Sequence, residues 1–357
     1  MNFNKIGLSL GLFTIVASIV SANFPSGVEQ FYSSKLFPII RQILDNTVGR
    51  VPSFLSYAFI FSIATAVLLL FYNLGYYGFK KDVSALKNLG LIVLSTLCFL
   101  LFTFYTLWGY NYKRTPLAVS LNCNIEILKP LELEKELDSA ISDLEKSLIG
   151  LNAHELGQNT PSVDDIRTSV ANFLNKNHFV VKGKPKVDFI APKGALYYFG
   201  ISGVYNPFLG RACVESGEHD IERYFTTAHE LSHAYGFTNE GDCNFLAYAA
   251  LSESENPHLV YSARLNYFRY VGGAYKRAFP SKYIEKRKKL SPIIIADLDA
   301  INDIHKKYPT FLNTSFLNDK YLKIQGVKEG LASYGAIVNW GAAWRKKNFA
   351  NFTQNVY

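Results

Sequence analysis

The chain has 357 residues, of which 49% are hydrophobic and 15% aromatic, and its formal net charge is +8. This length predicts one or two domains. The positive charge would suit a nucleic-acid-binding protein, but the sequence has no zinc knuckle, RNP-like run or arginine-rich helix, so we expect no nucleic-acid partner. Four dispersed cysteines without a CxxC pair exclude a disulfide framework and a thiolate zinc site. A single bridge between Cys123 and Cys213 stays open for an oxidising compartment.

Three long apolar runs occupy residues 6–22, 54–77 and 89–110. A helix that crosses a membrane needs about 20 apolar residues, which the second and third runs clearly provide and the first nearly provides. The first run ends in Val20-Ser21-Ala22, so cleavage as a signal peptide is an alternative for it. We therefore predict a membrane anchor over residues 1–112 that contacts the lipid bilayer.

The short loop between the second and third runs holds Lys80, Lys81 and Lys87 against Asp82. Because positively charged loops tend to stay in the cytoplasm, we expect residues 113–357 on the other side of the membrane. The stretch 23–53 joins the first two runs and has apolar residues at helical spacing. It predicts either an amphipathic helix on the membrane surface or a connector helix packed on the outer domain.

The remaining chain alternates helical patterns with one segment of short strands. Apolar periodicity near 3.6 predicts the helices, which we place at residues 131–148, 162–175, 221–252 with a break at Gly236, 260–275, 294–307 and 327–346. The stretch 186–214 is rich in Gly, Tyr and Pro and predicts short strands and turns. The fold class expected is therefore mostly α (α+β), with three N-terminal transmembrane helices followed by a predominantly helical domain carrying a small β element.

The most specific motif of the sequence is His229-Glu230-Leu231-Ser232-His233, an HExxH pattern. Two histidines four residues apart on a helix share one face, so both imidazoles can reach one metal ion. A zinc ion there would lower the pKa of its bound water to about 7, and Glu230 would act as the general base. The alternative is a pair of buried, hydrogen-bonded histidines. A buried helix with two histidines and a glutamate, however, needs a partner for those polar groups, which a metal provides.

A catalytic zinc usually has three protein ligands, so the third has to follow the motif closely. Glu240 and Asp242, which begin the helix after Gly236, are the two candidates. The run Glu240-Gly241-Asp242-Cys243-Asn244 is similar to a pattern of zinc peptidases in which the first glutamate binds the metal. In that pattern the residue four positions later hydrogen-bonds a ligand. The similarity favours Glu240 as the ligand and Asn244 as its support, with Asp242 as the alternative ligand.

Several segments together resemble the DUF3810 family of bacterial membrane proteins. The HELSHAYGF run and the E-x-D-x-NFLAY run carry the resemblance. So do the shorter segments Val28–Ser33, Trp108–Tyr112, Gly200–Phe208, Tyr261-Ser262, Tyr321–Lys323, Gln325–Val327 and Ser333–Gly335. The resemblance covers nearly the whole chain and implies a zinc metallopeptidase with a zincin-like domain. Asp242 and Cys243 depart from the family pattern, in which glutamate and alanine are usual.

These observations predict a membrane-anchored zinc metallopeptidase of the bacterial cytoplasmic membrane, multi-pass, with its catalytic domain over residues 113–357 outside the cytoplasm. Its substrate would be a peptide or protein of the cell envelope, and Tyr205 or Tyr261 would stabilise an oxyanion. Two alternatives remain: an amidase acting on cell-wall peptide, and a non-enzymatic sensor or scaffold with a structural or vestigial metal site. The sequence does not indicate the oligomeric state.

Overall fold

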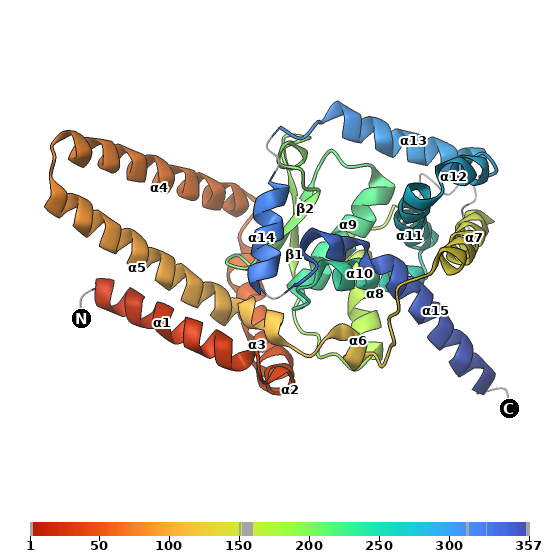
Figure 1. Cartoon of the computed structure of the whole chain (residues 1–357), viewed down its shortest axis with the longest axis horizontal. Coiled ribbons are helices and arrows are strands. Elements are labelled where there is room, and N and C mark those ends of the chain that lie inside the picture. Colours follow the sequence, from red (N-terminus) through yellow and green to blue (C-terminus); the bar gives the residue numbers. More distant parts are fainter. Residues whose placement is uncertain (1–2, 150, 152–159, 312–313, 326, 355–357) are drawn as a thin grey trace. The chain divides into compact units, whose positions relative to one another are not determined.

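The structure is a computed structural model that describes residues 3–149, 151, 160–311, 314–325 and 327–354. The chain divides into two compact units (Figure 1). The first unit comprises Met1–Arg114 together with Asn206–Arg211. The second comprises Thr115–Tyr205 and Ala212–Tyr357.

Three helices of the first unit are long and apolar enough to cross a membrane: α1 (Phe3–Ser21), α4 (Phe54–Phe79) and α5 (Val83–Leu107). They confirm the three predicted membrane helices. Small residues let α1 approach α5 closely, because a Cβ atom on Gly7 would lie 2.5 Å from the Ser95 carbonyl oxygen. A Cβ atom on Gly11 would lie equally close to Cys98 Sγ, at 2.5 Å. Such small residues are what close packing between membrane helices requires.

The chain between α1 and α4 is helical for most of its length. It contains α2 (Pro25–Gly27), the π-helix η1 (Val28–Leu36), α3 (Phe37–Asn46) and the 3₁₀ turn η2 (Val48–Arg50). The 3₁₀ turn η3 (Gly109–Lys113) follows α5. The Tyr32 hydroxyl of η1 donates to the carbonyl oxygen of Thr106 at 2.9 Å, and Arg114 pairs with Glu29 at 2.6 Å. These bonds fix the connecting segment to the end of α5.

The segment Asn206–Arg211 completes the first unit. Arg211 is fully buried and its guanidinium donates to the carbonyl oxygens of Val48 and Val51. The ring of Phe208 stacks on Phe59 of α4, with centroids 5.9 Å apart. Hydrogen bonds to backbone carbonyl oxygens lower the cost of burying this guanidinium.

The second unit is predominantly helical and has a three-stranded sheet, as the sequence predicts. Its helices are α6 (Leu117–Ser120), α7 (Pro130–Ile149), α8 (Val163–Lys176), α9 (Asp220–Ala234), α10 (Glu240–Ser252), α11 (Pro257–Ala278), α12 (Pro280–Arg287), α13 (Pro292–Lys307), α14 (Ser315–Gln325) and α15 (Ile337–Gln354), with 3₁₀ turns η4 (Tyr197–Phe199) and η5 (Gly330–Ala336). The strands β1 (Lys186–Ile190), β2 (Gly203–Asn206) and β3 (Arg211–Glu215) pair in the order β1-β3-β2. The strand β2 therefore lies at an edge of the sheet.

Local sequence signals account for two helix boundaries in the second unit. Ser162 and Asp165 form a capping box that starts α8, which satisfies backbone N–H groups that would otherwise lack a partner. Gly236 has a φ of 90° and lies between α9 and α10, where glycine tolerates the left-handed backbone. The predicted single helix over 327–346 is wrong, because Gly330 has a φ of 54° and the 3₁₀ turn η5 precedes α15.

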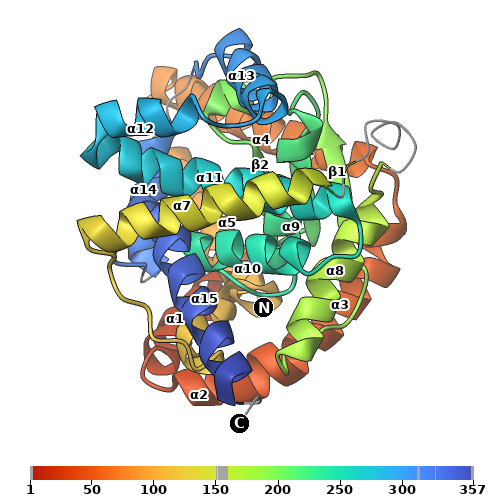
Figure 2. The same cartoon turned by 90° about the vertical axis from the view of Figure 1, so that its right-hand side faces the viewer.

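The helices α7, α11 and α10 pack side by side in the second unit (Figure 2). The core between helices contains fully buried side chains such as Leu231 of α9 and Phe245 of α10. Phe245 stacks on Trp340 of α15 with ring centroids 4.3 Å apart. Cys123 and Cys213 are both free thiols, so the candidate bridge between them is not formed.

Candidate metal centre

Three side chains from two consecutive helices converge on one point. His229 and His233 lie one turn apart on α9, and their Nε2 atoms are 3.1 Å apart. Oε2 of Glu240, the first residue of α10, lies 3.0 Å from the Nε2 atom of His229 and 3.2 Å from that of His233. Within the described part of the chain, this is the one group of three or more His, Cys, Asp or Glu side chains that is compact enough to hold a metal ion.

The separations of these atoms match what a metal ion requires. Two atoms that each bond zinc at about 2.0–2.1 Å with a tetrahedral angle lie roughly 3.3 Å apart. The observed separations of 3.0 to 3.2 Å are close to this value. Two imidazoles and one carboxylate also form a common ligand set of catalytic zinc, in which the fourth position stays open.

Hydrogen bonds on the far side of each imidazole orient the ring. The Nδ1 atom of His229 lies 2.8 Å from Oδ1 of Asn244, and that of His233 lies 2.8 Å from the carbonyl oxygen of Phe237. Since both partners are acceptors, each Nδ1 atom carries the proton and each Nε2 atom keeps a lone pair for the metal. This is the bond predicted for Asn244, whose amide in turn donates to the carbonyl oxygen of Tyr334 at 3.0 Å.

Electrostatics favour a positive charge at this point. Burial opposes ionisation of Glu240, but His233 and His229 outweigh it and hold the pKa of Glu240 well below its usual range. Burial likewise lowers the pKa of His233, but Cys243 and Glu240 reverse the effect and raise it above its usual range. The lowered pKa of Glu240, and its own contribution to the raised pKa of His233, mean that this buried carboxylate stabilises a cation beside it, whether that cation is a proton or a metal ion.

Asp242 points away from this cluster. The indole N–H of Trp340 donates to Oδ1 of Asp242 at 3.0 Å, so this carboxylate contacts α15 instead of the histidines. The structure therefore brings Glu240, and not Asp242, to the two imidazoles.

Glu230 lies beside the cluster with only 4% of its surface exposed. Burial raises the pKa of Glu230 to about 7, against the opposing effects of His229 and His233. Its Oε2 atom has no hydrogen-bond partner among the residues that the structure describes. Backbone also approaches this carboxylate closely, because a Cβ atom on Gly203 of β2 would lie 2.5 Å from Oε1 of Glu230. A buried carboxylate with an unused oxygen is suited to accept a proton from a bound reactant.

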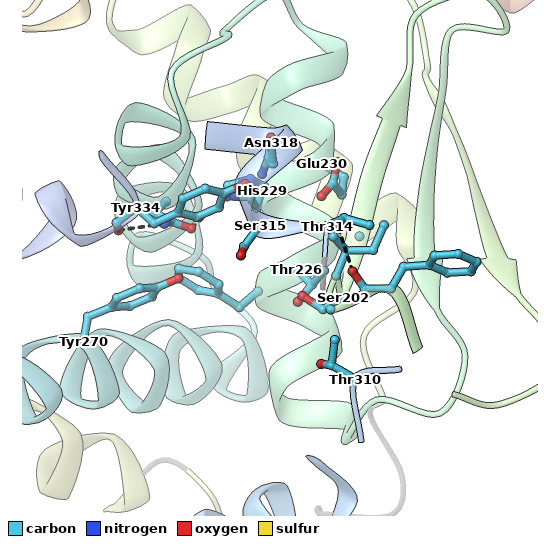
Figure 3. Close-up of a pocket in the computed structure, with 16 residues that line it drawn as sticks. Ser202, Thr226, His229, Glu230, Tyr270, Thr310, Thr314, Ser315, Asn318 and Tyr334 are labelled. Carbon is cyan, nitrogen blue, oxygen red and sulfur yellow. Dashed lines mark hydrogen bonds between the residues drawn. The ribbon is translucent and has the colours of Figure 1, made fainter. Parts of the chain in front are cut away.

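Glu230 and His229 line a cavity of about 380 Å³ (Figure 3). Among the described residues that line it, tyrosines are the only other ionisable side chains. Neutral polar groups line much of it: Ser202, Thr226, Thr310, Thr314, Ser315 and Asn318. Tyr270 of α11 and Tyr334 of η5 supply the two tyrosines. The cavity thus lies against the candidate metal centre at His229 and Glu230 and is lined elsewhere largely by neutral polar groups.

Tyr334 lies beside the candidate metal-binding residue His229, and sequence patterns did not indicate it. Its ring lies nearly parallel to that of His229, with an interplanar angle of 8° and centroids 6.4 Å apart. The carbonyl oxygen of Tyr334 accepts from the side-chain amide of Asn244, which also contacts His229. Burial, followed by the charge of Glu240, raises the pKa of Tyr334, so its hydroxyl keeps its proton and can donate it to a negative partner.

The two tyrosines suggested by the sequence lie elsewhere. Tyr261 donates its hydroxyl to Asp297 at 2.6 Å and lines a different cavity. Tyr205 is buried in β2 and does not line the cavity of Glu230. The one clue to Tyr334 in the sequence was its membership in the Ser333-Tyr334-Gly335 run, which carries part of the family resemblance.

A second polar cluster holds the beginning of the metal-binding helix. Glu222 of α9 accepts from Arg269 at 2.6 Å and lies 3.0 Å from Nε2 of His305. One turn further along α9, the Thr226 hydroxyl donates to the buried carboxyl group of Glu218 at 2.7 Å. These contacts tie α9 to α11 and α13, and so fix the helix that carries His229 and Glu230.

Residues 32–341 match the model of a family described as a protein of unknown function (DUF3810). The match covers most of the chain and includes every residue of the candidate metal centre. No curated protein and no solved structure matches the chain.

Proposed function

We propose that this chain, which belongs to the DUF3810 family, is a membrane-anchored zinc-dependent hydrolase of peptide bonds. The family's function is unknown, so the proposal rests on the residues of this chain. The observation that carries it is the position of Glu230. This buried carboxylate has an unused oxygen and lies in a cavity beside three side chains that can hold a metal ion.

Each side chain has a distinct role in the proposed reaction. His229, His233 and Glu240 hold the ion, and Asn244 orients His229. A bound zinc ion supplies a water molecule of lowered pKa and polarises a carbonyl group. Glu230 takes the proton of the attacking water and passes it to the leaving amine. A purely structural metal site has no use for such a base, which argues against a sensor or scaffold.

Tyr334 is the group best placed to stabilise the negative charge of the transition state. Tyr334 lines the cavity together with Glu230, and its ring lies nearly parallel to that of the candidate ligand His229. A preorganised donor to a developing oxyanion contributes about 2.7–4 kcal/mol in enzymes that use one. We therefore assign Tyr334, in place of Tyr205 or Tyr261, the role of oxyanion donor.

The substitution Glu230→Gln tests the proposal. It keeps the size of the side chain and removes the base, so zinc content measured by mass spectrometry should stay at the wild-type level while peptide hydrolysis is lost. Glu253→Gln is the matched control, because Glu253 forms an exposed ion pair with Lys176 on the same unit. Equal turnover by wild type and Glu230→Gln, or purified wild-type protein without zinc, would refute the assignment. Recovery of iron in place of zinc would point to the oxygenase chemistry that the same ligand set can support.

The substitution Tyr334→Phe tests the oxyanion donor separately. It should lower kcat about 100-fold or more with little change in KM, because the lost bond forms mainly in the transition state. Tyr261→Phe is the control, since it removes a hydroxyl that contacts Asp297 outside this cavity. An unchanged kcat in Tyr334→Phe would show that the charge is stabilised by another group.

We also propose that the second unit faces the outside of the cytoplasmic membrane, where its substrate is an envelope peptide or protein. The turn between α4 and α5 carries Lys80 and Lys81, which favours the cytoplasmic side for that turn. In intact cells, Lys81→Cys should resist a membrane-impermeant maleimide and react only after permeabilisation. Labelling of intact cells would reverse the orientation.

A further inference from the structure

We propose that α3, with the end of η1, lies in the headgroup region of the membrane and binds the lipid surface through one apolar face. The inference concerns the first unit alone and does not depend on the metal centre. Of the two arrangements that the sequence left open for residues 23–53, the proposal favours the amphipathic helix on the membrane surface over the connector helix packed on the outer domain.

The course of the chain places α3 at a membrane surface. The segment 22–53 connects α1 to α4, two helices that are long enough to cross the bilayer. A connection between consecutive spans begins and ends at the same surface. Figures 1 and 2 show α3 running across the direction of α1 and α5 instead of alongside them. A helix in this position runs along the membrane surface.

One face of α3 is buried against other parts of the first unit. Phe37 and Leu44 are 3% and 7% exposed, and Arg41 between them is buried and pairs with Asp45 at 2.5 Å. A Cβ atom on Gly210 would meet the guanidinium of Arg41, so the loop after β2 covers this side. Because this face is buried, the rotation of α3 about its own axis is fixed.

A neighbouring face is apolar and uncovered. Leu36, Ile39 and Ile43 are spaced three and four residues apart, and they are 47%, 50% and 57% exposed. Large aliphatic side chains at this spacing form a continuous stripe along a helix. Such a stripe would be costly in water, whereas a helix lying in the membrane interface buries it among acyl chains.

The neighbouring helix ends identify lipid as the occupant. Phe24, just after α1, is 62% exposed, and Phe54, the first residue of α4, is 61% exposed. Large apolar side chains are thus exposed both on α3 and at the ends of the two spans that this segment connects. Lys35 lies over the Phe31 ring at 5.2 Å at the start of the stripe. An exposed lysine beside apolar residues commonly extends to lipid phosphates while its stem contacts the acyl region.

Nitroxide labels on the full chain test this proposal. The labels are placed at Ile39→Cys and Ile43→Cys, with Gln42→Cys as the matched control on the same helix. All three positions are exposed. The background is Cys98→Ala, because Cys98 is the only cysteine that is not buried. The protein is reconstituted in vesicles of phosphatidylethanolamine and phosphatidylglycerol. Collision rates with oxygen, which concentrates in lipid, and with a water-soluble nickel complex are then measured.

The proposal expects a several-fold higher ratio of oxygen to nickel collisions at positions 39 and 43 than at position 42. Nickel collisions at 39 and 43 equal to those at 42 would place the stripe in water and overturn the proposal. Protection of 39 and 43 from both reagents would also overturn it, because the stripe would then be covered by protein, such as a second copy of the chain. Each outcome is independent of catalytic activity.

Discussion

The contact between Gly203 and Glu230 predicts that Gly203→Ala blocks hydrolysis without removing the metal. An alanine Cβ would lie 2.5 Å from Oε1 of Glu230, about 0.9 Å short of the 3.4 Å at which ordinary contacts begin. The backbone of Gly203 is not in the left-handed region, so this contact is the main obstacle to the substitution. A displacement of about 1 Å at a catalytic group costs roughly 100-fold in rate, or about 2.7 kcal/mol of transition-state stabilisation.

The assay compares kcat and zinc content for wild type, Gly203→Ala and Gly273→Ala. Gly273 is a glycine of α11 where the nearest atom to a new Cβ is Nη1 of Arg277 at 3.8 Å, so the control should behave like wild type. We expect Gly203→Ala to keep its zinc and lose about 100-fold in kcat. Wild-type turnover in this variant would refute either the close approach of β2 or the role of Glu230 as the base. Loss of zinc would mean that the substitution disturbs the ligands and not the base alone.

Further predictions concern the ligands and their supports. Glu240→Gln should lose the metal, whereas Asp242→Asn should retain it, because only Glu240 lies beside the histidines. Competitive titration with a chromogenic chelator measures the zinc affinity of both variants. Weaker binding by Asp242→Asn than by Glu240→Gln would make Asp242 the ligand. Asn244→Ala should weaken zinc binding about 10- to 100-fold through loss of the bond to His229, and unchanged affinity in the same titration would contradict that role. Removing zinc with a chelator should lower the Tm of the wild type by roughly 5–10 °C, since an ion at 100 times its Kd stabilises by about 2.7 kcal/mol; an equal Tm with and without chelator would show that no ion is bound.

Local spacing explains which parts of the site could be predicted from the sequence. Histidines four residues apart on one helix share a face whatever surrounds them. Gly236 then reverses the chain, so that the next helix necessarily starts near the motif with Glu240. The bond between Asn244 and His229 follows from the same short segment. The candidate membrane helices could also be predicted from the sequence, because composition and length alone identify them.

Contacts between distant segments explain what the sequence could not provide. Tyr334 reaches the site because η5 packs on α10, where a Cβ atom on Gly241 would lie 2.4 Å from the Ser333 carbonyl oxygen. No periodic pattern in the sequence predicts that contact. The chain contains 23 tyrosines, so composition does not identify the one that lies at the site. The choice between Glu240 and Asp242 also depended on a distant residue, since Trp340 of α15 engages Asp242. Likewise, the helix expected over 327–346 begins later because of the backbone at Gly330, which periodicity does not reveal.

The chain order of the site has a consequence for biosynthesis. The ligands and the base all lie within residues 229–240, whereas Tyr334 and Asn318 lie far toward the C-terminus. The candidate ligands and Glu230 are therefore synthesised well before Asn318 and Tyr334. The lining of the cavity is complete only once this later part of the chain has been made.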